Sequence, residues 1–114
     1  MIYPSSERHH SKIGATGLCD REDLVSIEQL GGCGRLLGVL TIPAGGSIPD
    51  HTHQGEFEVY YMLSGHGRYH ENGTVRSLGP GDVAYCPAGE SHGIYNDSDS
   101  EEIVFVAFIG FPVK

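Results

Sequence analysis

Residues 45–65 read GGSIPDHTHQGEFEVYYMLSG and contain the most informative pattern of the chain. Its spacing is Gly45-(X)5-His51-Thr52-His53-(X)4-Glu58-(X)6-Gly65. Successive side chains of a strand point to opposite faces, so His51 and His53 share a face, about 7 Å apart along the chain. Gly55 permits a tight turn after His53, which could bring Glu58 back alongside on the next strand. The stretch therefore predicts two strands that gather two imidazoles and a carboxylate.

A second stretch, residues 81–96, reads GDVAYCPAGESHGIYN and adds the imidazole of His92. Only a closed or folded-over sheet would bring His92 to the same place as the first three donors. Three neutral imidazoles and one carboxylate suit Mn, Fe, Co, Ni, Cu or Zn better than Mg or Ca, and leave an octahedral ion with open positions. The predicted cofactor is therefore a divalent transition metal ion, with Mn, Fe, Ni, Co and Zn all compatible, held by His51, His53, Glu58 and His92.

Both stretches resemble the two motifs of the cupin superfamily, in particular its small single-domain members. The resemblance covers residues 45–96 and matches every signature position, namely Gly45, His51, His53, Glu58, Gly65, Gly81, Pro87, Gly89, His92 and Asn96. It implies an all-β fold, an antiparallel jelly-roll barrel (double-stranded β-helix) with the metal ligated inside by the same four residues. It does not imply one reaction, because cupins include dioxygenases, decarboxylases, isomerases, storage proteins and sugar-sensing domains.

Length and composition agree with one compact domain. The chain has 114 residues, with 17 glycines and 6 prolines that favour a turn-rich β protein. Its net charge of −8 argues against nucleic acid or an anionic membrane as a partner. No apolar run approaches the roughly 20 residues that span a bilayer, the first residues lack a signal peptide's pattern, and the three cysteines show no metal-type spacing. We expect a cytoplasmic protein with reduced thiols.

Residues 1–22 are polar and without a regular period, so we expect an irregular N-terminal arm before a single barrel domain over residues 23–114. Strands are expected over residues 24–30, 35–42, 57–64, 65–71, 74–78, 82–86, 91–95 and 102–109, with Asn72-Gly73 as a two-residue hairpin turn. The last strand is apolar at every position from Ile103 to Ile109, so both its faces must be buried. We therefore predict a homodimer.

Several residues near the motifs have alternative roles. Glu56 could replace Glu58 as the acidic ligand, or remain a solvated turn residue. Tyr60 shares the face of Glu58, where it could pack or donate a hydrogen bond to a bound ligand. Cys86 could face the pocket or fill a small space. Arg35, Arg68 and Arg76 are the strand arginines that could reach the metal, and each could equally be a surface arginine paired with an acid.

Two functions are compatible with this pattern. The first is a metalloenzyme of the dioxygenase, decarboxylase or isomerase type, acting on a small oxygen-rich metabolite that chelates the ion, with Tyr60 or Glu56 carrying a proton. The second is a non-catalytic module that binds or senses a small molecule.

Asn96 and Asp82 are expected to serve the fold by satisfying backbone groups of turns.

Overall fold

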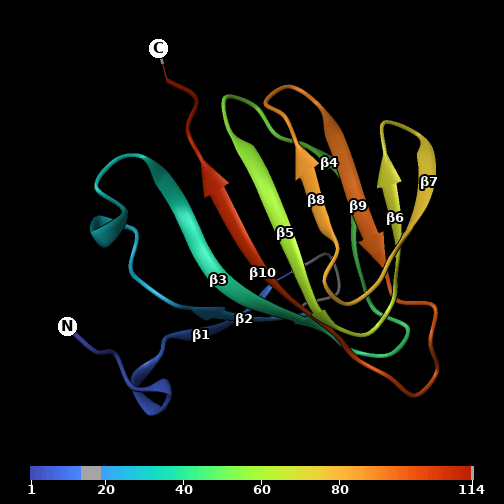
Figure 1. Cartoon of the computed structure of the whole chain (residues 1–114), viewed down its shortest axis with the longest axis horizontal. Helices are drawn as coiled ribbons and strands as arrows, with labels where there is room; N and C mark the ends of the chain where they lie inside the picture. Colours follow the sequence, from blue (N-terminus) through green and yellow to red (C-terminus); the bar gives the residue numbers. More distant parts are fainter. Residues whose placement is uncertain (14–18, 114) are drawn as a thin grey trace.

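The computed structural model describes residues 1–13 and 19–113 and confirms an all-β, antiparallel jelly-roll barrel (Figure 1). Two short 3-10 helices, η1 (Ser5–Glu7) and η2 (Glu28–Leu30), lie near the start of the chain. The described strands are β1 (His10–Ile13), β2 (Cys19–Asp23), β3 (Gly34–Ile42), β4 (Ser47–Thr52), β5 (Phe57–Ser64), β6 (Gly67–Glu71), β7 (Thr74–Leu78), β8 (Val83–Cys86), β9 (Ser91–Tyr95) and β10 (Ile103–Gly110).

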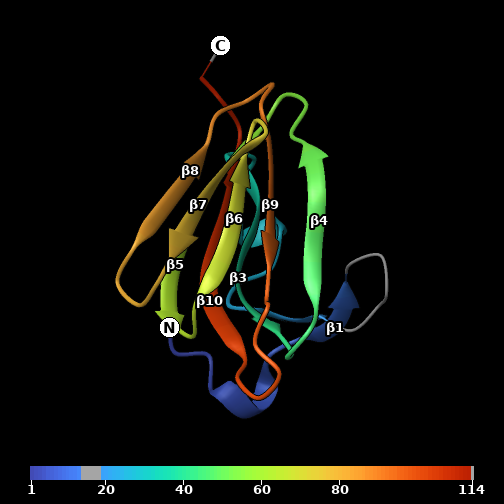
Figure 2. The same ribbon diagram turned by 90° about the vertical axis from the view of Figure 1, so that its right-hand side faces the viewer.

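The strands form two sheets that face each other (Figure 2). The larger sheet has six strands in the order β1-β2-β3-β10-β5-β8, and the smaller has four in the order β4-β9-β6-β7. Strand β10 lies between β3 and β5, and its residues alternate between buried and half-buried. Phe105, which is fully buried, pairs with Leu40 on one side and Met62 on the other. The core therefore lies between the sheets.

The predicted strands from residue 35 onward are confirmed to within two residues at each end. Asn72 and Gly73 form the expected turn, with φ of 49° and 85°. The side chain of Asp82 accepts a hydrogen bond from the backbone of Gly79 in the turn before β8, and Asn96 bonds backbone groups of two loops, as predicted. Both residues therefore serve the fold.

The strand predicted over residues 24–30 is wrong. The backbone N–H of Gln29 donates to the hydroxyl of Ser26 at 3.2 Å, and the side-chain oxygen of Gln29 accepts from the backbone N–H of Ser26 at 2.7 Å. This reciprocal pair is a capping box, which starts a helical turn whatever the apolar content of the segment. The turn is η2, and it ends at Gly31 with a left-handed φ of 63°.

The N-terminal segment is more regular than expected. Strand β2 pairs with β3 and β1 pairs with β2, so both extend the six-stranded sheet. The guanidinium of Arg8 donates to Glu22 at 2.6 Å, which ties the start of the chain to β2. Residues 14–18, which belong to the predicted arm, and Lys114 lie outside the described residues.

Candidate metal centre

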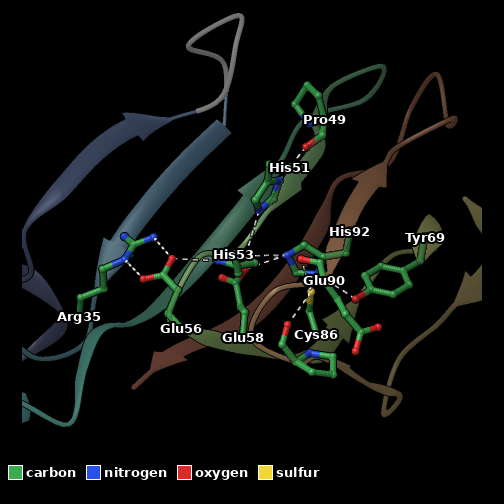
Figure 3. Close-up of polar contacts among 11 residues, drawn as sticks. Arg35, Pro49, His51, His53, Glu56, Glu58, Tyr69, Cys86, Glu90 and His92 are labelled. Carbon is green, nitrogen blue, oxygen red and sulfur yellow. Dashed lines mark hydrogen bonds and ion pairs between the residues drawn. The ribbon is translucent and has the colours of Figure 1, made fainter. Parts of the chain in front are cut away.

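The four residues predicted as metal ligands come together between the two sheets (Figure 3). His51 lies near the end of β4, directly opposite His92 on β9 in the smaller sheet. His53 follows β4, and Glu58 lies on β5 of the larger sheet, after a turn in which Gly55 has the expected left-handed φ of 71°. His53, Glu58 and His92 are buried, while His51 is half-buried. A small molecule from solvent would therefore reach the cluster from the side of His51.

The ligand atoms are spaced as neighbouring ligands of one octahedral ion. The Nε2 atom of His53 lies 3.0 Å from that of His51 and 2.9 Å from that of His92. The Oε1 atom of Glu58 lies 2.8 Å from Nε2 of His53 and 3.0 Å from Nε2 of His92. Ligands about 2.1 Å from an ion, at right angles to each other, are about 3.0 Å apart. The donor set and its spacing fit a divalent transition metal.

A partner behind each imidazole turns its Nε2 toward the centre. The Nδ1–H of His51 donates to the carbonyl oxygen of Pro49 at 2.8 Å, and the Nδ1–H of His53 donates to Glu56 at 2.9 Å. With Nδ1 protonated, a neutral imidazole carries a lone pair on Nε2. Two such lone pairs 3.0 Å apart repel unless a cation lies between them. A proton or a metal ion between the two Nε2 atoms would remove this repulsion.

Glu56, the alternative acidic ligand, lies behind His53. Its carboxylate accepts two hydrogen bonds from the guanidinium of Arg35, at 2.6 and 2.7 Å. This pairing, with His53 as a second donor, lowers the pKa of Glu56 to about 2 against the effect of burial. Glu56 is therefore ionised at neutral pH and, in this arrangement, orients the imidazole of His53.

Tyr60 lies beneath the cluster, on the inward face of β5 that the alternation predicted. Its ring is stacked on His92 with the centroids 5.0 Å apart. Complete burial, together with the nearby carboxylate of Glu58, raises the pKa of Tyr60 well above 10. Tyr61 and Leu63 are exposed on the other face of the strand. Tyr60 therefore remains protonated.

Cys86 lies opposite Glu58 on the inward face of β8, whereas Arg68 and Arg76 lie beside acidic residues. Burial raises the pKa of the Cys86 thiol to about 11, and its sulfur lies near the carbonyls of Pro87 and Glu90. Arg68 pairs with Asp97 at 2.8 Å, and Arg76 lies 3.7 Å from Glu71. All three cysteines are free.

Tyr69 makes a contact that the sequence did not predict. Its hydroxyl lies 2.8 Å from Nδ1 of His92, so His92 also has a partner behind its ring. Tyr69 is on β6, where it alternates with outward-facing Arg68 and His70. That alternation could have identified it as inward-facing, but not its pairing with His92, which depends on the neighbouring strand.

Metal binding is expected to release more than half a proton per ion at pH 6.5. The hydrogen bond to Glu58 is the largest of the effects that raise the pKa of His53 above its usual 6.5, and desolvation opposes it. More than half of the metal-free molecules therefore carry a proton on His53 at pH 6.5, and it must leave for Nε2 to bind an ion. Metal affinity is thus full above this pKa and falls as the pH drops through it.

Calorimetric titration with Mn²⁺ in two buffers of different ionisation enthalpy measures this release. The heats should differ at pH 6.5 and converge toward pH 9. Equal heats in both buffers at pH 6.5 would contradict the prediction.

Comparisons with known proteins identify relatives of the whole chain. A family model described as a cupin domain matches residues 38–109. An oxalate-binding protein of Thermotoga maritima is 37% identical over 113 residues, covering 96% of this chain and 93% of that protein. A crystal structure from the same organism, described as a predicted oxalate decarboxylase, has a TM-score of 0.88 and 33% identity, and the match covers 98% of this chain and 100% of that one.

A more distant structure shows the fold alone. It is an uncharacterised Klebsiella pneumoniae protein with a double-stranded β-helix domain, 24% identical with a TM-score of 0.73, and the match covers 96% of this chain and 88% of that one. Among residues 1–13 and 19–113, no helix is long and apolar enough to cross a membrane. With a family model that matches more than half of its length and a relative 37% identical over nearly all of it, this chain belongs to the cupin family.

Proposed function

We propose that this cupin binds a small dicarboxylate of the oxalate class through a divalent metal ion held by His51, His53, Glu58 and His92. The observation that carries the proposal is the set of four donors at the spacing of neighbouring octahedral ligands. Four protein ligands leave an octahedral ion two positions, and oxalate offers two carboxylate oxygens. The name of the Thermotoga maritima relative, oxalate-binding protein, supports this ligand class.

Charge also favours a dianion at this site. Three neutral imidazoles and the Glu58 carboxylate contribute one negative charge, so a bound divalent ion leaves the cluster with one positive charge. Without the ion, the ionised carboxylate of Glu58, whose pKa is lowered because hydrogen bonds and charges of His53 and His92 overcome its desolvation, is at most balanced by a proton on His53, so the cluster offers an anion no net positive charge. Dicarboxylate binding should therefore require the metal.

Calorimetric titration of oxalate into Mn²⁺-loaded protein tests the proposal. We expect saturable binding of one oxalate per chain, weaker binding of acetate, and loss of both after chelator treatment, with recovery when Mn²⁺ is returned. Oxalate binding that survives complete metal removal would sink the proposal.

A second candidate function is decarboxylation of the same ligand, because the 33% identical Thermotoga maritima structure is described as a predicted oxalate decarboxylase. Cleavage of the carbon–carbon bond releases carbon dioxide, and the electron pair left behind takes a proton to give formate. Of the proposed proton carriers, Glu56 is held ionised by Arg35, and Tyr60 is fully buried with a raised pKa. Neither gives up a proton readily, so we rank binding first.

Incubation with ¹³C-oxalate followed by NMR distinguishes the two functions, because only decarboxylation produces formate.

We further propose that the chain forms a homodimer through the outer face of its six-stranded sheet. Val39, Val106, Tyr61 and Val83 form a row across four adjacent strands on this face. Tyr61 is 47% exposed and Val83 is 62% exposed in the single chain. A continuous apolar row at the centre of an exposed sheet is typical of an interface core.

The Tyr61→Asp variant is expected to be monomeric where the unaltered protein is dimeric, because a charge would be buried without a partner. Val75→Asp is the matched control, since Val75 is also an exposed apolar residue but lies on β7 of the other sheet. Size-exclusion chromatography with light scattering gives the mass of each. An unaltered protein that is monomeric across the concentration range would contradict the proposal.

A cytoplasmic location without nucleic-acid or membrane partners also remains a proposal. Three free cysteines suit a reducing compartment, and a net charge of −8 disfavours contact with polyanions.

A further inference from the structure

The strand that carries His51 contains a β-bulge. On either side of it, β4 pairs regularly with β9, as Ile48 opposite Ile94 and as His51 opposite His92. Between these pairs β4 has two residues, Pro49 and Asp50, whereas β9 has only Gly93. Two residues opposite one define a bulge, which changes the face to which the following side chains point.

The bulge decides where His51 points. Ile48 packs against the core, and His51, three positions later, reaches toward the same interior. In a regular strand, residues three apart point to opposite faces, so one of these two side chains would face solvent. The extra residue in the bulge therefore lets β4 contribute Ile48 to the core and His51 to the cluster.

Contacts on the outer face of the small sheet hold the bulge. The hydroxyl of Tyr95 accepts a hydrogen bond from the backbone N–H of Asp50 at 3.1 Å and donates one to its carboxylate at 2.6 Å. His70 adds a contact of 3.1 Å to the same carboxylate. Gly93 leaves room for the bulge, because a Cβ there would lie 2.7 Å from the backbone nitrogen of Asp50 and even nearer its carboxylate.

The bulge also supplies the partner of His51. The carbonyl of Pro49 accepts the hydrogen bond from its Nδ1–H at 2.8 Å, so the same two residues fix both the direction and the tautomer of the ring. Mutation of a group that hydrogen-bonds a metal-ligating imidazole typically lowers metal affinity about tenfold to a hundredfold.

We propose that Asp50, Gly93 and Tyr95 form a clamp that positions His51 as a metal ligand without touching the metal site. The inference rests on the proposed metal centre. It assigns a role in metal binding to three residues on the opposite face of the sheet. The clamp fixes the bulge, and the bulge sets the direction of the imidazole.

The test compares Tyr95→Phe, which removes only the hydroxyl, with Tyr85→Phe, an exposed tyrosine on β8 that has no contact with the bulge. We expect Tyr95→Phe to lower Mn²⁺ affinity by about tenfold and Gly93→Ala by up to about a hundredfold. Tyr85→Phe should leave it unchanged. Asp50→Asn keeps an acceptor for the Tyr95 hydroxyl and should stay within about threefold of the unaltered protein.

A metal-free readout separates this inference from the proposed function. NMR of ¹⁵N-labelled imidazoles should show His51 as the Nδ1–H tautomer in the unaltered protein and a mixture of tautomers in Tyr95→Phe. Failure of the unaltered protein to bind metal would sink the proposed function, and the tautomers would still test the clamp. If a folded Tyr95→Phe variant kept both its Mn²⁺ affinity and its His51 tautomer, the clamp proposal would be overturned, even if that variant were less stable.

Discussion

The His53→Ala variant is expected to lose its metal ion. His53 is the central donor of the cluster, with its Nε2 atom within 3.0 Å of His51, His92 and Glu58. Structural zinc sites with four ligands bind their ion with about 10–16 kcal/mol, which by analogy gives each ligand here roughly 3 kcal/mol, so affinity should fall by more than about a hundredfold. Plasma mass spectrometry of protein purified without chelators measures the metal content, and Mn²⁺ titration measures the affinity.

His66→Ala is the matched control, because His66 is exposed on the turn between β5 and β6 and contributes nothing to the cluster. It should keep the metal content of the unaltered protein. Equal metal content in His53→Ala and the unaltered protein would show that the metal is bound elsewhere, and would remove the basis for oxalate chelation at this cluster.

Local spacing predicted much of the donor cluster, whereas the barrel was predicted from the resemblance of the two motifs to those of cupins. The pattern His51-Thr52-His53 places two imidazoles on one side of a chain, and Gly55 allows the turn that returns Glu58. The position of His92 needed only the assumption that the sheet closes. Side-chain alternation likewise placed Tyr60 on the same face as Glu58, where it is buried.

The other features depend on contacts between residues far apart in the sequence, which the spacing of nearby residues does not show. Alternation alone places Ile48 and His51 on opposite faces, and only the pairing of β4 with β9 reveals the bulge at Asp50. The contact of Arg35 with Glu56 joins residues 21 positions apart. Strands β1 and β2 lack an apolar period, and only their pairing with each other and with β3 identifies them as strands.

Replacing Asn96 with aspartate is expected to destabilise the metal-free protein by about 4 kcal/mol. The side-chain amide of Asn96, only 3% exposed, donates to the carbonyls of Ile42 and Pro43, each at 3.1 Å, and of Glu101 at 2.8 Å. It thereby ties the turn between β3 and β4 to the loop before β10. A carboxylate cannot donate, so it would leave buried carbonyls without partners and set a negative charge against them.

Urea unfolding of Asn96→Asp at two pH values measures this effect and its cause. Burial beside three carbonyl oxygens should raise the pKa of the new carboxyl group, and the protonated form can restore one hydrogen bond. The loss of stability should therefore be smaller at pH 5 than at pH 8. Gln54→Glu makes the same exchange on an exposed side chain and should stay within about 0.5 kcal/mol. A loss below about 1 kcal/mol in Asn96→Asp would mean that the two loops do not depend on this amide.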